Sequence, residues 1–144
     1  MKRTLIGLAL LFSAALPCSS FAADSALTIQ DPYVRLTPPN ALATGAFMII
    51  RNTGKADRKL VKADSPVAKN VELHNHINEN GIMKMRQIQE IDVKANGQAE
   101  LKPGSYHVML IGMHKSLQEG ESVPITLNFD DGTRLQINAP GRKL

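Results

Sequence analysis

The chain has 144 residues, of which 43% are hydrophobic and 21% charged, so it is long enough for one domain with its own core and too short for two ordinary domains. Its single cysteine, Cys18, excludes a disulfide framework and any zinc site built from several thiolates. The formal net charge is +4, and the basic residues are scattered along the chain, which gives no indication of nucleic-acid binding.

Residues 1–23 have the three parts of a secretory signal: a positive start, an apolar run at 5–16, and small residues before a cut near Ala22 or Ala23. The run is shorter than the ~20 residues that a spanning helix needs. Pro17, directly before Cys18, disfavours lipid attachment there. We therefore expect a cleaved signal peptide, export, and one domain over 24–144 with no membrane span. Loss of Lys2 and Arg3 leaves 15 of the 17 basic residues against 13 acidic ones, a net charge of +2.

After the leader, short runs rich in Val, Ile, Leu, Phe and Tyr alternate with Gly, Pro, Asn and Asp, and no helical stripe or repeat is present. The expected strands are 27–29, 33–36, 46–51, 58–63, 70–77, 82–88, 98–101, 105–111, 123–129 and 133–138. In 123–129, Ile125, Leu127 and Phe129 alternate with polar residues, as in a strand with one buried face. This pattern predicts an all-β antiparallel sandwich or barrel.

All four histidines, and four of the five methionines after the leader, lie between residues 74 and 114. Met48 stands in an apolar run and is assigned to the core. For each other methionine taken alone, the alternative is a gap-filling role in a core with only four aromatic side chains.

A four-residue loop at 78–81 would pair Ile77 with Ile82, so that His74 faces Met85 and His76 faces Met83. These four side chains would then share one side of the sheet, with opposed Cβ atoms ~4.5–5.5 Å apart.

In the strand at 105–111, His107 and Met109 share one face, and Tyr106, Val108 and Leu110 form an apolar face opposite. An isolated histidine on a strand is more often structural than a metal ligand. The methionine two residues on leaves both roles open for His107.

Imidazole and thioether donors without thiolate or carboxylate form a soft set that selects Cu(I) over Mg²⁺, Ca²⁺ or Mn²⁺. Zinc would normally bring Cys, Asp or Glu into its shell. A blue-copper electron carrier requires a cysteine thiolate, which the chain lacks after the leader. Copper storage or transfer therefore remains.

The spacing of four of these residues resembles the motif of the periplasmic PCu(A)C copper chaperones. The spacing is His74, ten residues, Met85, twenty-one residues, His107, one residue and Met109. Tyr33 stands where relatives often carry Trp, and Leu144 is not followed by the His/Met-rich tail that gives some relatives a second, Cu(II)-type site. The flanking segments that agree are 31–35, 71–74, 101–110, 117–120 and 123–125.

The resemblance implies a cupredoxin-like β-sandwich in the periplasm that is not an enzyme. It implies one Cu(I) per chain, held by His74, Met85, His107 and Met109, and delivery to the binuclear copper centre of cytochrome c oxidase, in subunit II, alongside a thiol-bearing copper chaperone. We expect a monomer. The remaining soft donors would form at most a weak auxiliary Cu(II) site; they are His76, Met83, Met113 and His114.

Two other functions stay open. One is a secreted protein-binding module that uses its methionine-rich face as an adaptable contact surface. The other is copper tolerance or storage without a role in oxidase assembly. A hydrolase is disfavoured because the chain has no Gly-x-Ser-x-Gly or His-Glu-x-x-His motif and no cysteine nucleophile. A copper oxidase is disfavoured because four soft ligands leave no open position for a substrate.

Overall fold

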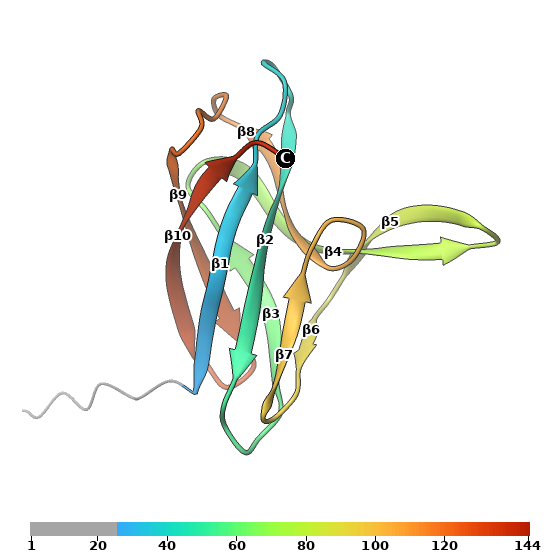
Figure 1. Ribbon diagram of the computed structural model, residues 1–144, viewed down its shortest axis with the longest axis vertical. Helices are drawn as coiled ribbons and strands as arrows, with labels where there is room; N and C mark the ends of the chain where they lie inside the picture. The colour runs from blue at the N-terminus through green and yellow to red at the C-terminus, as the bar shows by residue number, and fades with distance from the viewer. Residues whose placement is uncertain (1–25) are drawn as a thin grey trace, which may run out of the picture.

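The computed structural model describes residues 26–144, and these form ten β-strands (Figure 1). The predicted signal peptide, 1–23, lies outside the described residues. Within 26–144 there is no helix of the length and apolarity that crossing a membrane requires. The strands are β1 (Leu27–Arg35), β2 (Ala43–Asn52), β3 (Arg58–Asp64), β4 (Ala68–Glu79), β5 (Ile82–Ile88), β6 (Ile91–Val93), β7 (Gly97–Leu101), β8 (His107–Met113), β9 (Ser122–Phe129) and β10 (Arg134–Arg142).

The strands join in the order β5-β4-β8-β2-β1-β10-β9-β3-β6, with β7 also paired to β2. The pairings between the described strands are antiparallel, except that β1 and β10 run parallel over Val34–Gly141 and Arg35–Arg142. The all-β, single-domain prediction is confirmed, and the purely antiparallel arrangement is corrected at this one pair. A parallel pair needs a long connection, and here almost the whole described chain separates the two strands.

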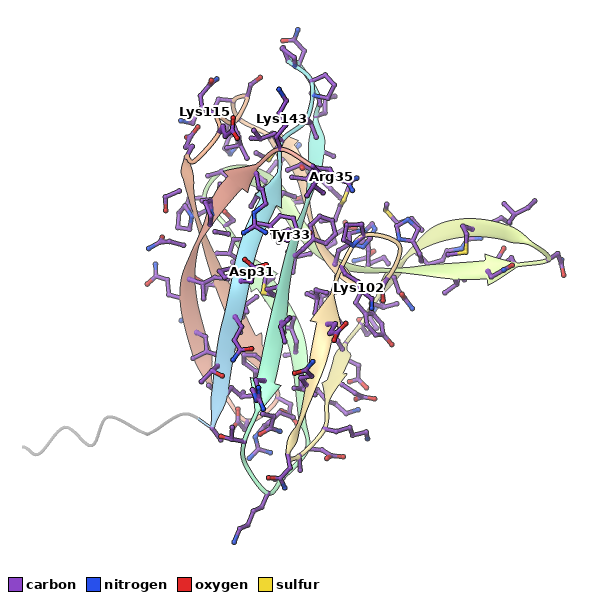
Figure 2. All side chains as sticks on the ribbon, in the orientation of Figure 1. Asp31, Tyr33, Arg35, Lys102, Lys115 and Lys143 are labelled. Carbon is purple, nitrogen blue, oxygen red and sulfur yellow. The ribbon has the colours of Figure 1, made fainter. Side chains whose placement is uncertain are left out.

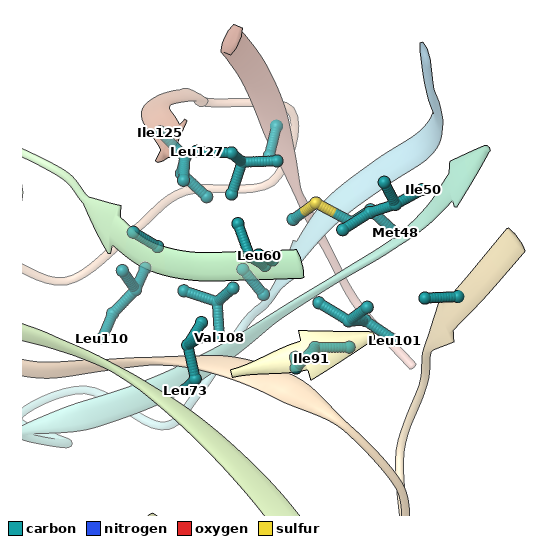
Figure 3. Close-up of a cluster of buried hydrophobic side chains, with 14 of the residues drawn as sticks. Met48, Ile50, Leu60, Leu73, Ile91, Leu101, Val108, Leu110, Ile125 and Leu127 are labelled. Atoms are coloured by element: carbon teal, nitrogen blue, oxygen red, sulfur yellow. The ribbon is translucent and has the colours of Figure 1, made fainter. Parts of the chain in front are cut away.

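The sheet folds over on itself into two facing parts, and one core lies between them. One part contains β2 and β8, and the other contains β3 and β9 (Figure 3). The alternation expected in β9 is confirmed, because Ile125, Leu127 and Phe129 are buried while the residues between them are partly exposed. Met48 is 2% exposed and belongs to the core, as predicted.

β2 has two partners along the same edge. Its first residues pair with β8, and the residues from Met48 onward pair with β7. Phe47 lies between these pairings, on the face of β2 opposite the buried Ala46 and Met48. Here the chain between β7 and β8 turns at Gly104, whose φ of +80° favours glycine. The ring of Phe47 therefore stands on the outer face of the sheet, beside this turn.

β4 belongs to two parts of the molecule. Its residues from Ala68 to His74 pair with β8, and its residues from Leu73 to Glu79 pair with β5. Beyond His74, the hairpin of β4 and β5 projects from the sandwich (Figure 1). We call residues 75–87 the arm. The arm is continuous with the body through β4, without a loop between them.

The predicted register of this hairpin is wrong. Glu79 pairs with Ile82, so the loop has two residues, Asn80 and Gly81, with φ angles of 54° and 83°. An Asn-Gly pair with positive φ at both residues is the favoured two-residue hairpin turn. His76 consequently faces Met85, in place of the expected Met83. Because the shift is even, the histidines and methionines keep a common face.

Other strands also differ from expectation, and β2, β4 and β10 extend beyond the segments predicted for them. Segments 27–29 and 33–36 are one strand, β1, whose register shifts between Gln30 and Tyr33 around Asp31, at φ 45°. β6 was missed because three residues are too few for a recognisable alternation. β8 begins at His107, two residues later than predicted, because Ser105 belongs to the preceding turn.

Candidate metal centre

A cavity of about 330 Å³ lies where the arm leaves the body. Three of the four predicted ligands line it: Met85 from the arm, and His107 and Met109 from β8. The fourth, His74, is next to it, since it pairs directly with His107 and their ring centroids are 5.6 Å apart. His76 also lines the cavity. The predicted residues thus converge on one place, although they come from three strands.

The imidazole of His107 is 3% exposed. Its Nδ1 lies 3.0 Å from the carbonyl oxygen of Ser105. A carbonyl can only accept, so Nδ1 carries the proton and Nε2 is left with a lone pair. Nε2 is buried and has no hydrogen-bond partner among the described residues. His107 therefore offers one free, inward-held nitrogen donor.

Burial lowers the pKa of His107 below its ordinary value, and the nearby His74, His76 and Arg35 lower the pKa further by charge repulsion. The hydrogen bond to Ser105 acts in the opposite direction, but burial is the largest effect. The neutral form is the one that can bind a metal. The fold thus favours the neutral, metal-binding form of this imidazole more than an exposed histidine would.

His74 is held in a similar way by a different group. Its Nε2 lies 2.7 Å from a carboxylate oxygen of Glu72, two residues earlier on the same face of β4. An ionised carboxylate only accepts, so Nε2–H donates and Nδ1 keeps the lone pair. Nδ1 is buried without a partner in the part of the chain that the structure describes. A carboxylate behind a metal-binding histidine commonly orients it and raises its basicity.

The two sulfur donors differ in their exposure. Met109 is half-buried and pairs across the sheet with Gly45, which also lines the cavity. A Cβ at Gly45 would lie 2.9 Å from the ring of Phe47, so glycine leaves room for that ring. Met85 is 42% exposed. The cavity therefore has a sheltered sulfur on the body and an accessible sulfur on the arm.

The surroundings of the cavity are aromatic and positively charged. The ring centroid of Phe47 lies 6.0 Å from that of His107 and 5.3 Å from that of Tyr33. The guanidinium carbon of Arg35 lies 5.7 Å from the centre of the Phe47 ring. Figure 2 shows Tyr33 and Arg35 along β1. The lining residues include no Asp or Glu, so a hard divalent cation would find no charged oxygen ligand here.

Residues 26–144 contain no group of three His, Cys, Asp or Glu side chains arranged to hold a metal by themselves. A metal in the cavity would therefore depend on methionine sulfur as well as imidazole nitrogen. That combination suits Cu(I).

The other soft donors do not gather at a second place. Met83 lies farther out on the arm, opposite Asn78, and is 55% exposed. Met113, at the far end of β8, faces Ala68 and packs against the core. His114 follows it and donates its backbone N–H to Val67. Of the residues considered for an auxiliary site, the structure places His76 alone in the cavity.

Sequence reasoning did not single out Glu72, Gly45 and Phe47 as part of this site. Glu72 had a usable signal, because it stands two residues before His74 and therefore shares its face in a strand. The sequence contains no such signal for Phe47, because the position of its ring depends on where β7 and β8 separate along β2.

The sequence matches the family described as "Putative lipoprotein LpqE-like" over residues 27–141. It is 32% identical over 98 residues to "Putative lipoprotein Lxx21020" of Leifsonia xyli, covering 67% of this chain and 59% of that protein. It is 28% identical over 120 residues to "Uncharacterized protein RP573" of Rickettsia prowazekii, covering 81% and 66%. The chain thus spans about three fifths to two thirds of these relatives' lengths.

Solved structures with the same fold include the copper-bound PCuAC domain from PmoF2, with a TM-score of 0.71, 18% identity, and coverage of 83% of this chain and 95% of that one. The solution structure of apo-DR1885 from Deinococcus radiodurans has a TM-score of 0.66 and 29% identity, covering 100% and 97%. The Cu(I) form of DR1885 has a TM-score of 0.64 and 30% identity, covering 82% and 77%. The chain therefore belongs to the LpqE-like family and has the fold of the PCuAC domains, which agrees with the resemblance to the PCu(A)C chaperones.

Proposed function

We propose that this chain is an exported metallochaperone that binds one Cu(I) through His74, Met85, His107 and Met109. The observation that carries the proposal is the pair of buried nitrogens, Nδ1 of His74 and Nε2 of His107, which have no hydrogen-bond partner among residues 26–144. His107 lines the cavity together with two thioethers, Met85 and Met109, and His74 pairs directly with His107. Buried polar atoms are rarely left unpaired. The similarity to copper-bound PCuAC and Cu(I)-DR1885 supports copper as the ion.

Transfer would proceed by ligand exchange without a change in the oxidation state of copper. Met85 is the most exposed of the four donors that we propose, so an incoming ligand would replace its sulfur first. Thiolates bind Cu(I) more strongly than thioethers, and an acceptor with cysteines would therefore draw the ion away. We propose the binuclear copper centre of cytochrome c oxidase subunit II, or a thiol-bearing chaperone, as acceptor, with this protein acting as a monomer in the periplasm.

An anaerobic Cu(I) titration against a chromogenic chelator tests the site. We expect one Cu(I) per chain, with binding weakened by about 100-fold or more in His107→Ala and clearly weakened in Met109→Leu. His114→Ala, outside the cavity, is the matched control. A protein-binding module would take up no stoichiometric copper, so that result would replace the proposal by the contact-surface alternative.

A transfer assay separates delivery from storage or tolerance. The copper-loaded protein is mixed with the copper-free soluble domain of an oxidase subunit II, and the acceptor is then separated and its metal measured. Transfer of copper supports delivery. Retention of copper in the presence of this acceptor and of a dithiol chaperone would point to storage.

Export is tested by the mass of the protein recovered from the periplasm. We expect a mature chain that starts at Ala23 or Asp24. A chain that starts at a lipid-modified Cys18 would contradict this cleavage, and would agree with the lipoprotein names of the family and of the Leifsonia relative.

A further inference from the structure

His76 is a histidine that the four-residue motif does not use. It lies on β4 two residues beyond His74, the last residue that pairs with β8, and it pairs directly with Met85 across the arm. It lines the cavity together with Met85, His107 and Met109. Its ring centroid lies 5.3 Å from that of His107, against 5.6 Å for His74. By position, His76 is as close to the proposed site as His74 is.

The ring of His76 also has an unused nitrogen. Its Nδ1 is buried and has no hydrogen-bond partner in the described residues, although the side chain as a whole is half-buried. Structural histidines normally satisfy their buried nitrogens, and His76 shares its unpaired nitrogen with the two proposed ligands His74 and His107. With Nδ1 unprotonated, His76 would present a nitrogen lone pair beside the sulfur of Met85.

The arm and the body each contribute a pair of donors. His76 and Met85 oppose each other on the arm, and His107 and Met109 share one face of β8. His74 stands at the junction, paired with His107 on one side and Gln87 on the other. Two residues along a strand span ~6.5–7 Å. His74 and His76 therefore occupy adjacent positions on one face of β4, and the ring of each lies within 6 Å of the His107 ring, centroid to centroid.

We propose that His76 is a fifth, exchangeable copper ligand, which replaces His74 when Cu(I) is loaded or released. This inference rests on the proposed function. The bond from copper to Nδ1 of His76 forms as the bond to Nδ1 of His74 breaks, copper stays Cu(I), and both imidazoles are neutral throughout. The ion is then bound by His76 and Met85 on the arm while His107 and Met109 remain bound to it. It therefore does not lose coordination during the exchange.

The test uses the mature protein and the variants His74→Ala, His76→Ala, the double variant, His107→Ala and the control His114→Ala. Cu(I) affinity is measured by anaerobic chelator competition, the release rate by stopped-flow transfer to the chelator, and the number of nitrogen and sulfur neighbours by X-ray absorption. Circular dichroism melting of the copper-free proteins checks that each variant is folded. The arm contributes little to the core, so His76→Ala should fold normally.

We expect His76→Ala to slow copper release by about tenfold. His74→Ala should keep two nitrogen neighbours, because His76 takes its place, whereas the double variant should keep one nitrogen and lose about tenfold more affinity than His74→Ala alone.

The inference is overturned if His76→Ala releases copper at the wild-type rate and the double variant matches His74→Ala in affinity and in nitrogen count. If this happens while His107→Ala still weakens binding by about 100-fold or more, only the role of His76 fails. If the wild-type protein does not bind Cu(I), or His107→Ala binds it normally, the proposed function itself fails.

Discussion

The imidazoles of His74 and His107 share one arrangement: one nitrogen donates to an oxygen of the protein, and the other is buried without a partner among residues 26–144. The held nitrogen sets the tautomer, so the free nitrogen carries a lone pair before any metal arrives. The two oxygen acceptors are different, a backbone carbonyl for His107 and the Glu72 carboxylate for His74. The Glu72 carboxylate can be removed by mutation without changing a proposed ligand.

Glu72→Gln should weaken Cu(I) binding by about tenfold, because an amide orients His74 less firmly and does not raise its basicity as a carboxylate does. Anaerobic chelator competition measures the affinity. Glu90→Gln, at a carboxylate that pairs with Lys59 away from the cavity, is the control and should bind as the wild type does. Equal affinity of the two variants would show that Glu72 does not position His74.

The copper-free protein should lose stability as the pH falls below about 6.5, the ordinary histidine pKa. Burial holds the pKa of His107 below that value in the folded protein, so between the two pKa values the unfolded chain binds a proton that the folded chain does not. The free energy of unfolding therefore decreases as the pH is lowered through this range. Melting curves recorded at a series of pH values should show this decrease, and His107→Gln should flatten it. A slope unchanged in His107→Gln would assign the effect to other groups.

At the level of strands, the sequence predicted nine of the ten observed strands because their segments had clear alternation or strong turn residues. β9 is the clearest case, with its buried and exposed residues in the expected order. β6 has only Ile91 and Val93 as buried residues, which is too short a pattern. The hairpin register was missed because Asn78-Glu79-Asn80-Gly81 permits a loop of either four or two residues. Only the backbone at Asn80 and Gly81 distinguishes them.

The residues of the candidate site could likewise be predicted only in part. Spacing identified which side chains share a face, since that requires only the period of a strand. It did not predict that His107 would be buried on the outer face of the sheet, because the cover comes from Phe47 and the turn at Gly104, which are brought there by the split pairing of β2.

The arm should be the part of the described chain whose backbone hydrogen bonds open most easily. Gly81→Ala should destabilise the arm and leave the stability of the body unchanged. Gly81 and Gly132 have φ angles of +83° and +84°, and a Cβ at either position would meet no atom within 4 Å. Alanine therefore costs roughly 1–2 kcal/mol through backbone strain at both turns. Hydrogen exchange should become faster only in β4 and β5 for Gly81→Ala. Gly132→Ala, between two core strands, should lower the melting temperature, and a similar loss in Gly81→Ala would show that the arm folds with the body.

On the scale of the whole molecule, the sheet closes around its core through strands from both ends of the described chain. β1 and β10 meet in the parallel pair, and Asp31 of β1 and Arg142 of β10 also form an ion pair, with 2.7 Å between Oδ1 and Nη2. The ring of Tyr33 lies 4.3 Å from the Arg142 guanidinium carbon. This closure could not be predicted from local patterns because the partners are more than a hundred residues apart.

Leu60→Ala should destabilise the protein by about 2–5 kcal/mol, because Leu60 is fully buried between the two parts of the sheet and its loss leaves a cavity. Urea denaturation of the copper-free protein measures the change. Val61→Ala, at the next residue, which is 40% exposed, should cost about 1 kcal/mol or less. Comparable losses at the two positions would mean that Leu60 does not lie in the core as described.

β4 runs without interruption from the body into the arm, so an ion that joins Met85 to His107 would cross-link the arm to the body at the point where β4 leaves β8. Loading with copper would then restrict the bending of the arm, and unloading would restore it. The conformational entropy regained by the arm would offset part of the bond energy lost when the ion departs. A partner could thus receive copper from a donor whose sandwich stays folded throughout.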